Sequence, residues 1–168
     1  MNRAPQPCPL PPNALLRAYQ LDGGYADCYS TDLPLAVTHG RYVEAFYTTP
    51  LFKTERLILR LAIGKPSTDA QARQLAAGTL DAFAAWTVEK RADDQLLLAD
   101  IYGRTRSWLM VEPIAGGTRL YFGSAVVPRA RQRRSFGLLL GFHRLYSKAL
   151  LASARRRLVK FDKRAKLA

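Results

Sequence analysis

The 168-residue chain has few of the residues and motifs that most often identify an enzyme. It contains two cysteines and two histidines, and none of them has the close spacing of a zinc site. The sequence also has no glycine-rich phosphate loop, no G-x-S-x-G nucleophile elbow and no H-E-x-x-H metal motif. We therefore expect no bound metal and no cofactor.

Long apolar runs are missing as well. No segment approaches the roughly 18 apolar residues that cross a bilayer, and the amino-terminal residues lack the apolar core of a signal peptide. Apolar residues make up 48% and charged residues 23% of the chain, as in ordinary globular domains. The sequence predicts a soluble, cytoplasmic protein in which both cysteines are free thiols.

The distribution of proline and the chain length predict the domain organisation. Residues 1–13 contain five prolines, which disfavour regular helices and strands. We expect a mobile leader over residues 1–20, one domain over residues 21–160 and a basic tail over residues 161–168, since a chain of this length usually forms a single domain.

Negative charge is nearly absent from the carboxyl-terminal end. Residues 129–168 hold 13 basic residues and a single acid, Asp162, whereas residues 1–128 hold 13 basic and 12 acidic residues. Such a block is either a solvated helix end that complements the helix dipole, or a contact for an anionic membrane surface or nucleic acid. The residues of this candidate contact are Arg155, Arg156, Arg157, Lys160, Lys163, Arg164 and Lys166.

The first half of the chain predicts one strand followed by short helices. Residues 25–33, YADCYSTDL, alternate and are rich in tyrosine, which is typical of a strand. Helices are predicted over residues 38–47, 51–63 and 68–77, separated by proline and glycine. On the second of these helices, the acidic Glu55 shares a face with apolar residues.

The second half predicts a sheet and a long helix. Residues 79–127 have apolar side chains at period two with short turns, which indicates an antiparallel meander. Residues 133–160 have apolar side chains at three- and four-residue spacing, which indicates one long helix. An antiparallel sheet must bury at least one face, and this helix is the only element long enough to cover it. The predicted fold class is α+β, with a pocket between sheet and helix.

This order of elements resembles the helix-grip fold of the START/polyketide-cyclase-like (SRPBCC) superfamily. The stretches GRTRSWLMVEP (103–113), TRLYFGSAVVP (118–128) and FHRLYSKALL (142–151) resemble uncharacterised bacterial proteins related to the DUF2867 group. The resemblance implies a curved antiparallel sheet wrapped on a long carboxyl-terminal helix, with a cavity that binds an apolar or amphipathic small molecule. It carries over no catalytic motif.

Two polar residues interrupt the apolar stripe of the long helix. His143 and Ser147 lie one turn apart on the face that also carries Leu139 and Leu150. They are either ligand-binding groups, with His143 also able to act as an acid or base, or packing residues with internal hydrogen bonds. A catalytic triad with His143 would need a distant acid such as Asp27, Asp81 or Asp100.

A second candidate pair lies on the strand predicted from residue 104 onward. Arg106 and Trp108 share one strand face with Arg104 and Met110. If this face lines the pocket, Arg106 clamps a carboxylate and Trp108 stacks on a ring. If the face is exposed to solvent, these side chains protect a sheet edge.

Three functions follow as hypotheses. The first is a domain that binds an apolar or amphipathic small molecule, with no reaction assigned. The second is contact of the basic end with an anionic membrane surface or nucleic acid. The third is a lyase or cyclase that uses His143.

Overall fold

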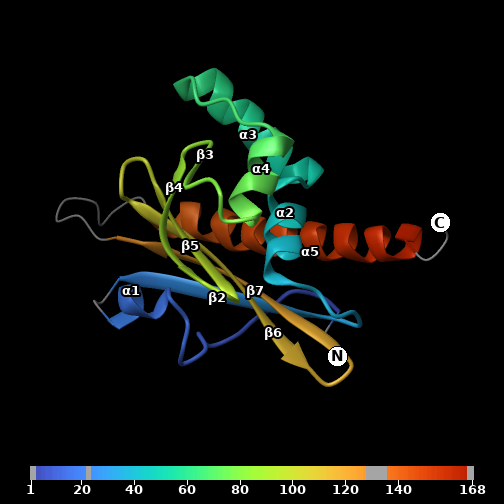
Figure 1. Cartoon of the computed structure of the whole chain (residues 1–168). Coiled ribbons are helices and arrows are strands. Elements are labelled where there is room, and N and C mark those ends of the chain that lie inside the picture. The colour runs from blue at the N-terminus through green and yellow to red at the C-terminus, as the bar shows by residue number, and fades with distance from the viewer. Residues whose placement is uncertain (1–2, 22–23, 128–135, 166–168) are drawn as a thin grey trace.

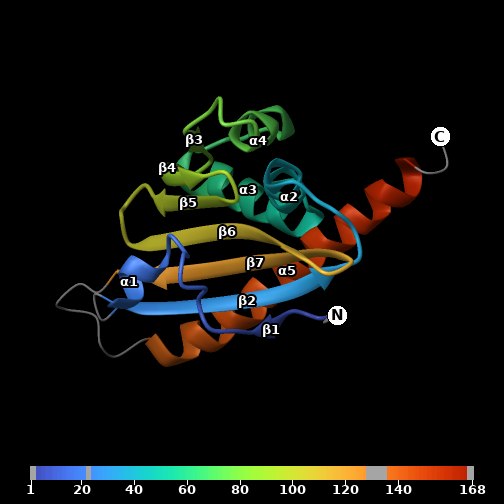
Figure 2. The ribbon, with the colours of Figure 1, turned by 60° about the horizontal axis from the view of Figure 1, so that its bottom comes forward.

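The structure is a computed structural model that describes residues 3–21, 24–127 and 136–165, with side chains of the last helix described over residues 144–162. Figures 1 and 2 show a central sheet with a long helix across one face and the amino-terminal segment against the other. The elements in chain order are β1 (Gln6–Pro7), α1 (Arg17–Leu21), β2 (Tyr25–Leu33), α2 (His39–Tyr47), α3 (Pro50–Ile63), α4 (Asp69–Ala76), β3 (Ala82–Phe83), β4 (Trp86–Ala92), β5 (Gln95–Asp100), β6 (Thr105–Ile114), β7 (Gly117–Val126) and α5 (Phe136–Ala165).

The seven strands form one antiparallel sheet in the order β1-β2-β7-β6-β5-β4-β3. Strands β3 to β7 are neighbours in chain order, so the predicted meander is confirmed, and β2 has the predicted bounds. The α+β class, with short helices after β2 and a long carboxyl-terminal helix on the sheet, is also confirmed. Within the described ranges, no helix is both long and apolar enough to cross a bilayer.

The three helices that follow β2 begin at threonine caps. The side chains of Thr38, Thr49 and Thr68 each accept a hydrogen bond from a backbone N–H of the following turn, which satisfies a donor that has no partner within the helix. The last of these caps is a capping box completed by Gln71. Helix α3 ends at Gly64, whose φ of 65° is the left-handed conformation that glycine adopts without strain.

One face of the sheet forms the main core with α2, α4 and α5. Among the described side chains of α5, the buried apolar ones are Leu150, Leu151, Ala154 and Leu158, at the three- and four-residue spacing predicted for its inward face. Aromatic side chains of α2 and α3 fill the space above the sheet; Phe46 lies 5.0 Å from Phe122 of β7, between ring centroids. The helix ends at Ala165 and not at residue 160; its predicted start over residues 133–135 lies outside the described residues.

The other face of the sheet is covered by the proline-rich segment, which the sequence predicts to be a leader outside the domain. Leu10, Ala14 and Leu16 are buried there in a second cluster that contains Trp108 of β6. Gln95 of β5 fixes this cover, since its side chain bonds with the backbone of residues 13 and 15 and accepts from the Trp108 indole at 2.8 Å. Prolines prevent a helix here, but an extended chain that hydrogen-bonds to side chains needs no helix.

We predict that Leu151→Ala lowers the free energy of unfolding by about 2–5 kcal/mol, because the side chain is fully buried between α5 and the sheet. Leu145→Ala is the matched control on the same helix; its side chain is 69% exposed, so we expect a change within about 0.5 kcal/mol. Urea unfolding of both variants measures the difference. Equal values would contradict the packing of α5 on the sheet.

Candidate ligand cavity

A cavity of about 240 Å³ lies between the sheet and α5, closed on one side by α3. Its apolar wall comes from Phe46, Phe52, Phe122 and Leu150. Its floor contains Ser107 and Ser124, which face each other across β6 and β7. Small hydroxyl side chains at these positions leave space that larger apolar residues would fill. The complete lining is Phe46, Phe52, Glu55, Trp86, Thr105, Arg106, Ser107, Phe122, Ser124, Ala125, Val126, Tyr146, Ser147 and Leu150.

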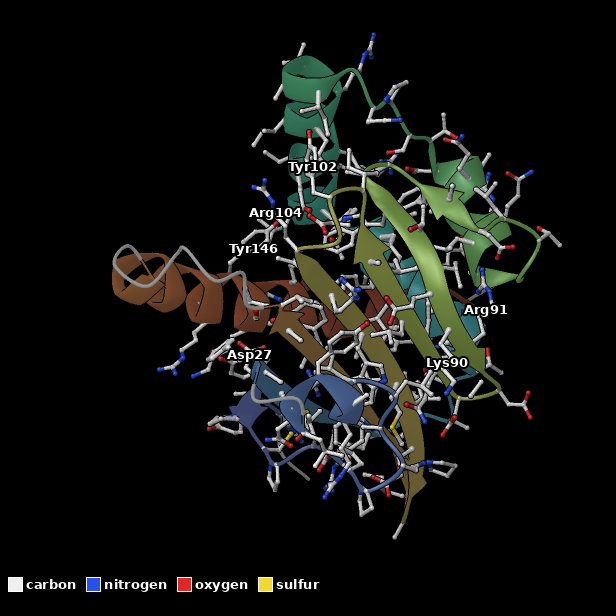
Figure 3. All side chains as sticks on the ribbon, turned by 90° about the vertical axis from the view of Figure 1, so that its left-hand side faces the viewer. Asp27, Lys90, Arg91, Tyr102, Arg104 and Tyr146 are labelled. Carbon is white, nitrogen blue, oxygen red and sulfur yellow. The ribbon has the colours of Figure 1, made fainter. Side chains whose placement is uncertain are left out.

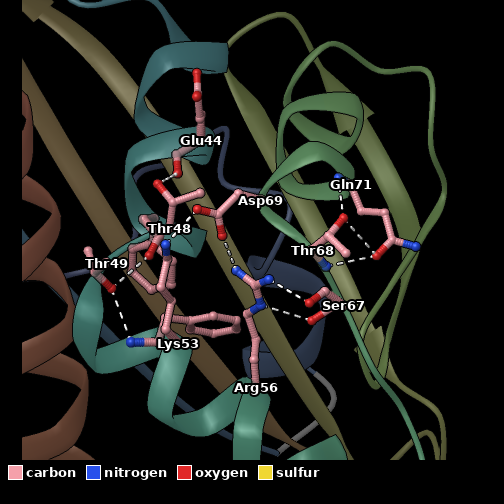
Figure 4. Close-up of polar contacts among 11 residues, drawn as sticks. Glu44, Thr48, Thr49, Lys53, Arg56, Ser67, Thr68, Asp69 and Gln71 are labelled. Carbon is pink, nitrogen blue, oxygen red and sulfur yellow. Dashed lines mark hydrogen bonds and ion pairs between the residues drawn. The ribbon is translucent and has the colours of Figure 1, made fainter.

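Helix α3 is held over the cavity by a buried arginine. The Arg56 guanidinium donates to the Ser67 hydroxyl at 2.9 Å, to the Ser67 carbonyl at 2.5 Å and to Asp69 at 2.7 Å, and Lys53 pairs with the same carboxylate (Figure 4). Burial alone would raise the pKa of Asp69, but the two cations together lower it. This network ties α3 to the start of α4, and Glu55, the residue before Arg56, lines the cavity.

Glu55 places a carboxyl group in this largely apolar cavity. The Tyr146 hydroxyl of α5 donates to Glu55 Oε2 at 2.5 Å. In Figure 3, Tyr146 lies on the same side of the domain as Tyr102 and Arg104. Burial raises the pKa of Glu55, and the hydrogen bond from Tyr146 opposes this only in part. Burial and the neighbouring carboxylate also raise the pKa of Tyr146. The pair therefore favours a protonated tyrosine and lets the neutral form of Glu55 persist to higher pH than in an exposed glutamate.

Two residues that line the cavity each carry a buried polar atom without a partner among the described residues. The Trp86 indole N–H and the Ser147 hydroxyl are both buried and without a hydrogen bond. An unsatisfied buried polar group costs about 1–3 kcal/mol, and such groups in native structures usually have a water or ligand partner. The indole nitrogen can only donate, so its partner must carry an acceptor.

The structure separates the four residues that the sequence predicts to bind a ligand. Ser147 lines the cavity. Arg106 also borders it, but its guanidinium pairs with Glu89 at 2.6 Å and lies over the Tyr19 ring at 4.7 Å. Trp108 lies on the opposite face of the sheet, under the amino-terminal segment. The strand face that carries Trp108 is thus covered by the amino-terminal segment. The side chain of His143 lies outside the described residues, so its role stays a prediction.

The three acids considered for a triad each have a structural partner. Asp27 accepts from the Ser124 hydroxyl at 2.6 Å, Asp81 pairs with Arg91, and Asp100 accepts from two backbone N–H groups of the turn before β6. Among the described residues, no group of three or more histidine, cysteine or acidic side chains is arranged to hold a metal ion.

Glu55, Tyr146 and Trp86 were missed as site residues from the sequence. For Glu55 a signal was present, because an acid on the apolar face of a predicted helix needs a reason to be there. Tyr146 gave no such signal, since its contact with Glu55 joins residues 91 positions apart.

We predict that Glu55→Gln stabilises the protein increasingly as the pH rises. A carboxyl whose pKa is raised on folding contributes no penalty below its ordinary pKa of about 4.3, and it costs stability as the pH rises through the raised value. The difference in unfolding free energy between variant and wild type should therefore grow as the pH rises above about 4 and level off above the raised pKa of Glu55. Tyr146→Phe removes the opposing hydrogen bond and should extend the dependence to higher pH. A pH-independent difference between Glu55→Gln and wild type would contradict this environment.

Comparison with known proteins does not identify a family, so the helix-grip resemblance rests on the order of the elements. No family model matches the chain, and no curated protein matches it. The function of the cavity must accordingly be argued from its own geometry.

Proposed function

We propose that the cavity between β6, β7, α3 and α5 binds a small amphipathic molecule. The observation that carries this proposal is an apolar cavity that holds buried polar groups without partners, the Trp86 indole and the Ser147 hydroxyl. A pocket that is mainly apolar with a few convergent polar groups is the usual form of a small-molecule site. The helix-grip resemblance points to the same class of ligand.

The lining defines what the ligand must offer. Its apolar body would lie against the phenylalanine rings and Leu150, and its polar end needs an acceptor for the Trp86 indole. Glu55 in its neutral form donates a second hydrogen bond, whereas its ionised form would favour a donor or a cation. The volume of about 240 Å³ is below the roughly 300–1,000 Å³ of sites for drug-sized molecules, so we expect a compact ligand such as a single-ring or short-chain compound bearing a carbonyl or hydroxyl group.

The first experiment identifies a ligand directly. We expect native mass spectrometry of the protein purified from its own host to show a bound species that denaturation releases. Chemical analysis of that species tests whether it is amphipathic and carries an acceptor. A released species that is purely ionic, such as a nucleotide, would contradict the proposal.

The second experiment tests where the ligand binds. We predict that the single-ring ketone acetophenone, used as the probe and followed by saturation-transfer NMR, binds the wild type and that Ser147→Phe weakens binding at least tenfold, because the new ring occupies the cavity. Leu145→Phe adds the same ring change to an exposed position of α5 and should leave binding unchanged. Val126→Phe fills the cavity from the sheet, and circular dichroism checks the fold of each variant. Binding that survives both filling changes would place the probe elsewhere.

A surface depression on α5 supports a second candidate function, the binding of phosphate groups. Arg156, Arg157 and Lys160 line a depression of about 600 Å³ with the hydroxyl-bearing Thr54 and Ser153. None of the described residues that line it carries a carboxylate, so the cations are available to an anion. Of the other residues of the predicted basic contact, Arg155 donates to the Asp32 carbonyl at 3.0 Å, and the side chains of Lys163, Arg164 and Lys166 lie outside the described residues.

We predict that Arg156→Gln/Lys160→Gln weakens binding to phosphatidylglycerol vesicles or to a single-stranded oligonucleotide and lowers the salt dependence of that binding. Lys65→Gln/Lys90→Gln removes the same charge from exposed positions elsewhere and serves as the control. The vesicle and oligonucleotide arms distinguish the source of the phosphate. Equal losses in the two double variants would assign the effect to net charge and would reject a site on α5.

A further inference from the structure

The chain's two cysteines lie side by side, although 20 positions separate them in the sequence. Their sulfur atoms are 3.2 Å apart as free thiols. Cys28 lies on β2 and is buried, whereas Cys8 follows β1 and is half-buried. The pair lies on the face of the sheet opposite the cavity, at the edge of the cluster formed by the amino-terminal segment.

The backbone already has the geometry that a disulfide requires. Strand β1 pairs with β2 so that Gln6 faces Ser30 and Pro7 faces Tyr29, and the Cys8 N–H donates to the Cys28 carbonyl at 3.0 Å. This register places Cys8 directly opposite Cys28. Opposed residues of antiparallel strands have Cα atoms about 4.5–5.5 Å apart, within the range of about 4.4–6.8 Å seen across disulfides. Closing the bond therefore needs side-chain movement and no rearrangement of the strands.

The two thiols differ in a way that assigns them different chemical roles. A hydrogen bond between the two thiols lowers the pKa of Cys8 against the effect of burial, which favours its reactive thiolate form. The same hydrogen bond and deeper burial raise the pKa of Cys28. Cys8 is also the more accessible of the two, which makes it the attacking group and Cys28 the resolving group.

We propose that Cys8 and Cys28 form a reversible disulfide that fastens the amino-terminal segment to the sheet, with a low-molecular-weight disulfide such as oxidised glutathione as the oxidant. The Cys8 thiolate attacks one sulfur of oxidised glutathione, and one glutathione leaves as its thiolate. Cys28 then loses its proton and attacks Cys8 Sγ, which releases the second glutathione. The two protein thiols lose two electrons in total, and oxidised glutathione gains them.

The bond would add a covalent link to a part of the fold that is now held by the short pairing of β1 with β2 and by side-chain contacts. The loop that it closes contains Leu10, Ala14 and Leu16, which cover Trp108, and Tyr19, which contacts Arg106. Disulfides stabilise chiefly by restricting the unfolded chain. Oxidation should thus stabilise the packing of the amino-terminal segment on this face of the sheet. The residues that line the cavity on the other face should stay in place.

The test uses the full chain in buffers of reduced and oxidised glutathione, followed by N-ethylmaleimide in denaturant and intact-mass measurement. We expect a monomer two hydrogen atoms lighter that takes up no maleimide under oxidising conditions, and a form that takes up two maleimides after reduction. The oxidised wild type should melt roughly 5–10 °C above the reduced form. The double variant Cys8→Ser/Cys28→Ser should show no redox-dependent shift.

Single variants test the assigned roles. Cys28→Ser should accumulate a stable glutathione adduct on Cys8, whereas Cys8→Ser should react slowly because the remaining thiol is buried. Two free thiols under oxidising conditions, or disulfides found only between two chains, would overturn the proposal, and the wild-type measurement alone decides this if a variant fails to fold. Probe binding to the cavity is measured separately, so failure of the disulfide leaves the proposed function untouched.

Discussion

The pairing of β6 with β7 is the constraint on which the rest of the structure depends. The two ten-residue strands are paired without a shift from Thr105 with Val126 to Ile114 with Gly117. Side chains alternate between faces along each strand, so this register sends Ser107 and Leu109 toward α5 and Trp108 toward the amino-terminal segment. A shift of this register by one residue would exchange the faces to which the side chains point. The Trp108 indole would then point into the cavity.

One glycine makes this arrangement possible on the Trp108 side. Gly123 is the cross-strand partner of Trp108, and a Cβ atom on it would lie 2.8 Å from the Asp27 carbonyl oxygen, 2.8 Å from the Leu16 side chain and 2.9 Å from the indole. The absence of a side chain lets the tryptophan and the amino-terminal segment approach β7. Ser124, the next residue, contributes to the cavity on the other face, so dense packing and open space are adjacent along one strand.

The sequence predicts the parts of this fold that local chemistry determines. The glycine end of α3, the period-two strands and the apolar stripe of α5 each act within a few residues, and the structure confirms them. The contacts that build the cavity are different, because Glu55 and Tyr146 come together only when α3 and α5 pack. The cover over Trp108 has the same origin: Gln95 binds the backbone of residues 13 and 15 from some 80 positions away. No local pattern encodes such pairings, so composition alone makes the proline-rich segment look separate from the domain.

The sheet also divides the chain's two tryptophans between its faces. Trp86 lines the cavity, and Trp108 lies within the cluster formed by the amino-terminal segment. The protein therefore contains two intrinsic fluorophores in different surroundings: the emission of Trp86 would respond to a molecule that enters the cavity, and that of Trp108 would respond to changes near Cys28. Replacing either indole by phenylalanine isolates the signal of the other, so events on the two faces can be followed by spectroscopy in the same molecule without an attached dye.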